Sequence, residues 1–345
     1  MKISAAMIVK NEESMLPRCL KSIRDWVDEI VIVDTGSTDN TIEIAKQFKA
    51  RVFEHPWQND FSLHRNQSIN YSTGDWICII DADEEFVSDM SRFRKRLKKL
   101  PKHIKALVVS VNEISDKKQS TAWLGLRFFK RNSGIHYKNA VHNKAVYKGA
   151  CAATDIQMNH YGYSLEPDKM AAKRARTESL LLERLSKDDK DHAALYYLTQ
   201  LKIGEKKYKE ACEYGERFFY CVPVHPKDFQ FYGVMYFFMA WSELHLNEGG
   251  KALAWAKKGL EFYSDDLDLN YITGRIGFQA AMDDVLKEHG EKYLSLLPAI
   301  RNRNKAIGDS FENPLEPDKW FNRTIYSADE AAEKDMRKFM EVLAE

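Results

Sequence analysis

The sequence has few cysteines and no long apolar run. Its five cysteines are odd in number and scattered, with no C-x-x-C pair, which argues against a zinc site or a disulfide framework. We therefore expect reduced thiols in a cytoplasmic protein. No stretch approaches the roughly 20 apolar residues of a membrane-spanning helix. The apolar run over 3–9 is too short for a signal peptide and lacks a small-residue cleavage site.

The sequence also lacks an excess of either charge. With 52 Lys and Arg against 51 Asp and Glu, the net charge of +1 gives no global electrostatic reason to bind nucleic acid or an anionic membrane. A hydrophobic fraction of 44% with 30% charged residues is typical of a folded protein and excludes disorder. At roughly 150 residues per domain, the 345 residues predict about two domains.

Up to about residue 160, short apolar strands alternate with helical stretches. Strands are predicted over 3–9, 29–33, 51–54 and 76–80, and helices over 15–27, 40–48 and 64–71. This alternation predicts a mostly parallel sheet covered by helices, with ligands at the carboxyl ends of the strands. Polar clusters follow three of these strands: Lys10-Asn11-Glu12, Asp34-Thr35-Gly36 and Asp81-Ala82-Asp83.

From about residue 166 the strand signals vanish and helical spacing dominates. Helices are predicted over 171–185, 193–203, 208–220, 229–246, 252–262, 269–286 and 293–306. The junctions at 203–211 and 246–254 resemble those of tetratricopeptide repeats, and a weaker copy lies at 289–293. A plain helical bundle is the alternative. We predict domains over 1–165 and 166–345.

Two aspartates follow the predicted buried strand over 76–80. Asp81 and Asp83 are then held rigidly at a crevice, where one can bind a hard cation while its neighbour reaches a ribose or phosphate. Carboxylate oxygens suit Mg²⁺ or Mn²⁺ rather than zinc. Such a cation would stabilise the charge on a departing nucleoside diphosphate. The alternative is that both aspartates cap the following helix.

Four motifs in a fixed order favour the cation-binding role of Asp81 and Asp83 over the capping role. They are MIVKNEE over 7–13, VDTGSTDNT over 33–41, DFSLHRN over 60–66 and GDWICIIDADEE over 74–85. Together they resemble family 2 glycosyltransferases of the GT-A fold, over about the first 165 residues. The resemblance implies an α/β fold with a Rossmann-like mixed sheet, followed here by the all-α, repeat-like half. It also implies a metal-dependent enzyme with a nucleotide-sugar donor, usually acting with inversion at the anomeric carbon.

The resemblance also assigns residues to the nucleotide. Asp34 would accept a hydrogen bond from the base, which favours uracil and a UDP-sugar, although Asp-Thr-Gly-Ser also suits a plain turn. Arg65 would contact the nucleotide or diphosphate as a fixed fork of donors, or else form a surface ion pair. The other residues implied to bind the nucleotide are Val9, Asn11, Glu12 and Ala82.

Three residues are implied to act around the diphosphate and its cation. Asp81 would face the ribose, and Asp83 would bind Mn²⁺ or Mg²⁺. His160 begins a segment that closes the site in this group, and it would be a further contact to the metal or diphosphate. Imidazole is a plausible Mn²⁺ ligand. A lone histidine can equally be structural.

The general base is where the sequence departs from the resemblance. Many relatives carry a His-Glu pair, whereas this chain has His142 followed by Asn143, which cannot act as a base. Either His142 or another carboxylate such as Asp155 takes the role, or the acceptor needs little activation. A thiol acceptor would need less help than an alcohol, since its pKa is about 8.5. Loss of activity is the remaining alternative, against which the intact Asp81 and Asp83 argue.

The combined organisation resembles bacterial enzymes that glycosylate peptides, including S-glycosyltransferases of bacteriocin precursors. Repeat surfaces suit an extended peptide, so the helical half is expected to recognise a peptide or protein acceptor. The first alternative is transfer to lipopolysaccharide core or another cell-surface glycan, for which only the basic stretch 92–105 offers support. The second is an inactive transferase domain on a binding scaffold. Homodimer formation is left open.

Overall fold

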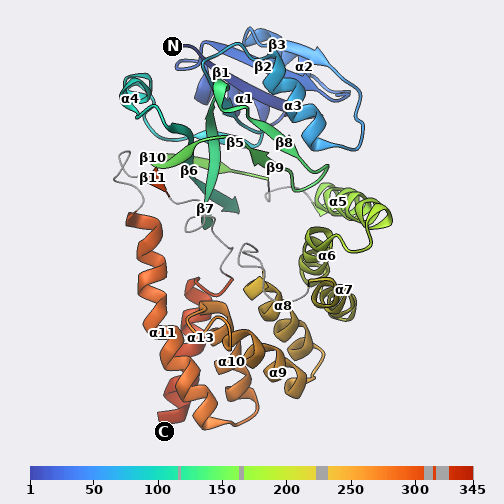
Figure 1. Cartoon of the computed structure of the whole chain (residues 1–345), viewed down its shortest axis with the longest axis vertical. Coiled ribbons are helices and arrows are strands. Elements are labelled where there is room, and N and C mark those ends of the chain that lie inside the picture. Colours follow the sequence, from blue (N-terminus) through green and yellow to red (C-terminus); the bar gives the residue numbers. More distant parts are fainter. Residues whose placement is uncertain (116–117, 163–166, 223–231, 307–313, 316–325, 345) are drawn as a thin grey trace. The chain divides into compact units, whose positions relative to one another are not determined.

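The chain forms two compact units in the computed structural model (Figure 1). The sheet unit comprises Met1–Met170 and Ala306–Trp320, and the helical unit comprises Ala171–Lys305 and Phe321–Glu345. The structure describes residues 1–115, 118–162, 167–222, 232–306, 314–315 and 326–344. The predicted all-helical second half overlooked one segment, because a short strand near residue 314 belongs to the sheet unit.

The sheet unit holds a mixed sheet with the strand order β11-β10-β6-β7-β4-β1-β2-β3, to which β5 adds by pairing with β10. The first strands are β1 (Ile3–Val9), β2 (Glu29–Asp34), β3 (Arg51–Glu54), β4 (Trp76–Ile79) and β5 (Glu84–Phe86). The others are β6 (Ile104–Ser115), β7 (Lys118–Lys130), β10 (Ala150–His160) and β11 (Pro314–Leu315). A separate ribbon joins β8 (His136–Lys138) to β9 (Lys144–Val146).

The parallel part of the sheet is the part that the sequence predicted. Strand β1 pairs in parallel with β2 and β4, and β2 pairs in parallel with β3. The long strand β7 is antiparallel to both β4 and β6, which makes the sheet mixed. The helices of this unit are α1 (Leu16–Ile23), α2 (Thr41–Gln47), α3 (Phe61–Tyr71) and α4 (Phe93–Lys99). The predicted α/β organisation with a mixed sheet is confirmed.

Strand β1 is apolar throughout because both of its faces are covered. Ile3, Ala5 and Met7 belong to the core on the α1 side, whereas Ala6 packs in the cluster that contains Ile69 of α3. Successive side chains of a strand point to opposite faces, so a strand covered on both sides needs no polar alternation. The buried residues of α1 follow helical spacing and are Leu16, Cys19, Leu20 and Ile23.

The basic stretch over 92–105 forms α4 and the start of β6. Phe93 and Leu97 are buried in the core. Two arginines of the helix form ion pairs within the unit, Arg94 with Asp28 at 2.9 Å and Arg96 with Asp155 at 2.6 Å.

The helical unit is built from antiparallel helix pairs. Its helices are α5 (Pro167–Lys187), α6 (His192–Gly204), α7 (Tyr208–Cys221), α8 (Tyr232–His245), α9 (Gly249–Leu260), α10 (Leu267–Gln279), α11 (Asp283–Ala306) and α13 (Glu330–Ala344). Helix α6 packs on α7 and α8 on α9, while α8 also contacts both α6 and α10. The predicted stacking of helix pairs is therefore confirmed. Tyr196, Tyr232 and Tyr236 are buried in the core of this unit. Within the described part of the chain, no helix is both long and apolar enough to cross a membrane.

Three helix junctions share one backbone motif. Lys206, Asn247 and Ala281 each adopt a left-handed conformation, with φ of 59°, 62° and 52°. In each case the next residue donates its N–H to a carbonyl five residues back, as in Lys207 to Lys202 at 2.9 Å. This is the Schellman arrangement that ends a helix. The repeat is therefore carried by backbone geometry, without a glycine at the left-handed position.

The predicted third junction at 289–293 is wrong. Helix α11 runs through this segment, and the turn lies instead between α10 and α11, at 280–282. Gly290 has a packing role, because a Cβ there would lie 2.6 Å from the Sδ atom of Met340 on α13. The glycine thus allows a close approach of two helices and does not end one.

The left-handed turns lead to a stability prediction. Ala281→Gly should stabilise the helical unit by about 0.5–1 kcal/mol, because a left-handed non-glycine residue costs about 1–2 kcal/mol and glycine loses part of that in backbone entropy. The neighbouring Ala280 has φ of −97°. Ala280→Gly should therefore destabilise the unit by a similar amount. Urea unfolding followed by far-UV circular dichroism distinguishes the two, and equal shifts of both variants would contradict the prediction.

Candidate active site

The first two motifs interlock at the carboxyl ends of β1 and β2. Thr35 donates its N–H to the Val9 carbonyl at 2.9 Å, directly beyond the strand pairing of Val9 with Asp34. Asn11 follows with a left-handed φ of 55°, and its side-chain oxygen accepts the N–H of Thr38 at 2.7 Å. These bonds join two segments that are distant in sequence into one loop cluster at the edge of the sheet.

The backbone of Glu12 and the side chain of Asp34 are both hydrogen-bonded within this cluster. The N–H of Glu12 donates to the Thr41 hydroxyl at 2.7 Å. The Asp34 carboxylate is buried and accepts the N–H groups of Gly36 and Ser37 at 2.9 Å each. Asp34 therefore shapes its own turn, as the plainer alternative proposed. A contact between Asp34 and a base stays a prediction.

Arg65 lies beneath the first aspartate of the Asp-Ala-Asp triplet. Helix α3 begins at an Asp60 cap, which accepts the N–H of Leu63 at 3.0 Å, and buries Arg65 on its inner face. The Nη2 group of Arg65 donates to Asp81 Oδ1 at 2.8 Å. Burial alone would raise the pKa of Asp81, but attraction to Arg65 and Arg127 holds it below its usual value. Arg65 Nε and Nη1 are buried and have no hydrogen-bond partner within the described residues.

A second ion pair, in which both side chains are largely enclosed, supports the triplet and was not predicted. Arg127 of β7 donates from Nη2 to Glu84 Oε1 at 2.5 Å, and Glu84 Oε2 accepts the N–H of Asp81 at 3.0 Å. Burial and repulsion from Asp81 raise the pKa of Glu84, and Arg127 opposes that rise. The one available sequence signal was an arginine within an apolar strand, which needs a charged partner when buried.

Strand β5 brings Asp83 to His160. The pairing of β5 with β10 places His160 opposite Glu84, and the Asp83 carbonyl accepts the N–H of Tyr161 at 2.8 Å. His160 Nε2 then lies 3.4 Å from Asp83 Oδ2, and its Nδ1 lies 2.9 Å from Glu113 Oε2. Burial lowers the pKa of His160, but hydrogen bonds to the two carboxylates outweigh it and raise the pKa to about 10.

The space between Asp83 and His160 is kept open by a glycine. A Cβ at Gly162 would lie 2.6 Å from both Asp83 Oδ2 and His160 Nε2. The carboxylate oxygen suits Mn²⁺ or Mg²⁺, and Mn²⁺ accepts an imidazole nitrogen more readily than Mg²⁺ does. Within the described residues, no three metal-binding side chains form a ready cluster, so these two groups are a partial ligand set.

The two predicted base candidates lie on other segments of the sheet unit. His142 is exposed in the turn between β8 and β9, with a left-handed φ of 49°. Asp155 lies on β10 five residues before His160, roughly 15 Å along an extended strand. Its carboxylate forms the ion pair with Arg96 of α4. The structure thus does not bring Asp155 together with Asp83.

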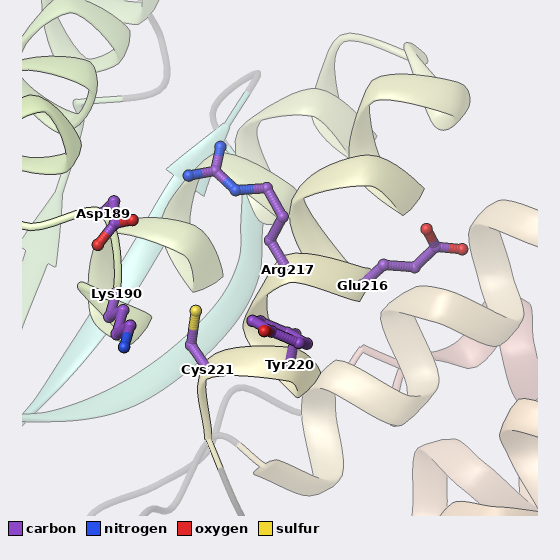
Figure 2. Close-up of a pocket in the computed structure, with 6 residues that line it drawn as sticks. All are labelled: Asp189, Lys190, Glu216, Arg217, Tyr220 and Cys221. Atoms are coloured by element: carbon purple, nitrogen blue, oxygen red, sulfur yellow. The ribbon is translucent and has the colours of Figure 1, made fainter.

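The helical unit contains a cavity of about 460 Å³ with a charged lining. Figure 2 shows its six lining residues, on α7 and in the turn between α5 and α6: Asp189, Lys190, Glu216, Arg217, Tyr220 and Cys221. Tyr220 is 87% exposed. An exposed aromatic ring beside charges of both signs can contact a polar chain such as a peptide.

The Glu84–Arg127 pair leads to a second stability prediction. Arg127→Met should destabilise the chain by about 3–5 kcal/mol, because it leaves a buried carboxylate without its partner. Adding Glu84→Gln keeps an acceptor for the Asp81 N–H and should recover at least half of that loss. A double-mutant cycle from urea unfolding measures this coupling, and strictly additive losses would contradict it.

The family comparison identifies the sheet unit. Residues 4–159 match the family model described as Glycosyl transferase family 2. This part of the chain is a family 2 glycosyltransferase domain, as its motifs predicted. The match ends one residue before His160 and covers the triplet, Arg65, Glu113 and Arg127.

Several curated proteins are similar to parts of this chain. A TPR repeat-containing protein of Synechococcus elongatus is 49% identical over 86 residues, 25% of this chain and 21% of that protein. The SPbeta prophage-derived glycosyltransferase SunS of Bacillus subtilis is 28% identical over 222 residues, 61% of this chain and 52% of SunS. An uncharacterized glycosyltransferase of Rickettsia felis is 39% identical over 89 residues, 26% of this chain and 31% of that protein. The chain spans about half or less of these relatives.

Solved structures are more distant. S. aureus TarS 1-349 in complex with UDP-GlcNAc aligns with 76% of this chain and 92% of its own length, at 12% identity and a TM-score of 0.42. A score at this level carries no information about the site.

Proposed function

We propose that this protein is a metal-dependent, inverting glycosyltransferase that moves a sugar from a UDP-sugar to a peptide or protein acceptor. The observation that carries the proposal is the pair formed by Asp83 and His160. Their oxygen and nitrogen face each other at 3.4 Å across a space that Gly162 keeps open. They lie near the carboxyl ends of the parallel strands of a family 2 domain, where the diphosphate of the nucleotide is expected to bind.

Asp81 and Asp83 have different proposed roles in binding the donor. Asp83 and His160 would hold the cation, whose charge would stabilise the departing nucleoside diphosphate when it is bound. Asp81 would accept from the ribose, and the Arg65 pair holds its carboxylate ionised and in place. The loop cluster formed by Val9, Asn11, Glu12 and Asp34, together with Ala82, would enclose the nucleoside.

Transfer with inversion also requires that the acceptor lose a proton. We assign this role to His142 rather than Asp155, because the Asp155 carboxylate is paired with Arg96 and lies roughly 15 Å along β10 from His160. A cysteine thiol as acceptor would reduce the demand on this base, since a larger fraction of it is ionised near neutral pH.

The helical unit supports the choice of a peptide or protein acceptor. Its stacked helix pairs resemble scaffolds that bind extended chains, and its cavity exposes Tyr220 beside Arg217 and Lys190. The alternative of transfer at a membrane surface is weakened by α4, because Arg94 and Arg96 are engaged in ion pairs inside the sheet unit.

The donor site can be tested with a single variant. Asp83→Asn should lower Mn²⁺-dependent hydrolysis of UDP-glucose or UDP-N-acetylglucosamine on the order of 10²–10³-fold, because one charged contact to the cation is lost. Asp89→Asn is the matched control, since Asp89 caps the exposed turn at Ser91. UDP release and calorimetric UDP binding, with and without Mn²⁺, are the measurements. A wild-type chain that neither binds nor hydrolyses these donors would favour the inactive-scaffold alternative.

The acceptor site calls for a different assay. Tyr220→Ala combined with Arg217→Ala should lower sugar transfer to a peptide library containing Ser, Thr and Cys by about 10-fold or more, the loss expected for a central contact residue. Donor hydrolysis should change less than about 2-fold. Phe262→Ala is the control, because Phe262 is 50% exposed elsewhere in the helical unit. Mass spectrometry of the peptides reports transfer, and unchanged transfer by the double variant would contradict a role for this cavity.

A further inference from the structure

Three side chains on neighbouring strands form a hydrogen-bonded chain that ends at the candidate metal site. Trp123 of β7 donates its indole Nε1–H to Glu113 Oε1 at 2.9 Å. The other oxygen of Glu113 lies 2.9 Å from His160 Nδ1. His160 Nε2 lies 3.4 Å from Asp83 Oδ2. Each end of the Glu113 carboxylate is thus engaged with a different ring.

The sheet register determines which carboxylate meets the imidazole. His160 is the pairing partner of Glu113 in the parallel ladder between β10 and β6. The side chains of both residues are largely enclosed, with exposed fractions of 13% for Glu113 and 16% for His160. Trp123 reaches Glu113 diagonally from β7, where it stands opposite Val111. The contact therefore comes from two strand pairings and does not depend on a loop.

A carboxylate is the side chain that suits this position. It offers two acceptor oxygens and no donor, so it can accept from the imidazole and the indole together. When it accepts from Nδ1–H, the other ring nitrogen is left to face Asp83. Second-sphere carboxylates orient ligating histidines in this way, and their loss typically costs 10–100-fold in metal affinity.

We propose that Glu113 is a positioning residue that orients the His160 ring toward the cation, with Trp123 fixing the Glu113 carboxylate. The inference rests on the proposed metal-dependent transfer. Glu113 acts through His160 and does not itself touch the donor. Trp123 remains 37% exposed. The centroid of its ring lies 5.2 Å from Cζ of Arg127. This contact connects the three hydrogen-bonded side chains to the buried Glu84–Arg127 pair.

The test measures Mn²⁺ affinity of the full chain in the presence of UDP, from the free Mn²⁺ signal in electron paramagnetic resonance. Glu113→Ala should weaken Mn²⁺ binding by about 10–100-fold. Trp123→Phe should change it less than about 3-fold, because Glu113 still accepts from His160. Glu113→Gln combined with Trp123→Phe should recover most of the affinity, since the single amide oxygen then has no competing indole donor.

A matched control separates positioning from general disturbance. Glu85→Ala removes a neighbouring carboxylate that accepts from the Tyr161 hydroxyl at 2.7 Å and not from the imidazole. It should leave Mn²⁺ affinity within about 3-fold of wild type. Urea unfolding checks that each variant is folded. A protected imidazole Nδ1–H signal in proton NMR, identified by its loss in His160→Gln, should disappear in Glu113→Ala and return in the Gln and Phe double variant.

The two proposals fail in different ways. A wild-type chain that binds no Mn²⁺ with UDP would overturn the proposed function. A wild-type chain that binds Mn²⁺, together with a folded Glu113→Ala variant of equal affinity and an unchanged Nδ1–H signal, would overturn the positioning role alone.

Discussion

The antiparallel pairing of β5 with β10 is the contact on which the candidate site depends. The chain leaves the parallel sheet after β4, forms the Asp-Ala-Asp turn and then adds β5 to the far end of β10. This pairing places Asp83 beside His160, although 77 positions separate them in the sequence. It also aligns Glu84 with His160, so the supporting buried charge and the candidate metal contact are positioned by one short ladder.

Buried charges hold this turn from below. Arg65 and Arg127 are cations in the interior of the unit, and each donates to a carboxylate of the 81–84 segment. A buried ion pair adds little net stability against an apolar replacement, yet removing one partner is costly. The arrangement is thus better understood as fixing the position of Asp81 than as stabilising the fold. It also keeps negative charge at the turn, as a cation contact requires. The near-zero net charge of the whole chain conceals this local organisation.

The helical unit shows how a repeat can persist without a repeating sequence. Its hairpins share a left-handed turn and a Schellman hydrogen bond, made by a lysine, an asparagine and an alanine in successive copies. Tyr196, Tyr232 and Tyr236 are buried in the core between these helices. An exposed aromatic side chain lies instead at the end of α7, where Tyr220 borders the charged cavity. A family 2 transferase domain followed by such a scaffold suits separate binding of donor and acceptor, which is the division of labour proposed for this chain.

The sequence alone determined the features that depend on local pattern. Apolar runs located β1 to β4, and the polar residues after them marked the edge where Asn11, Asp34 and Asp83 lie. Helical spacing determined that the second half is built from helix pairs. Only the tertiary structure decided what depends on pairing between distant segments. It showed β11 returning to the sheet, Arg127 beneath the triplet and Glu113 against His160. It also showed that Gly290 lies within α11, where it packs against Met340 of α13, and that Asp155 lies away from the candidate site. The physical reason is that strand register and helix approach are set by long-range packing, whereas a sequence pattern reports only what neighbouring residues prefer.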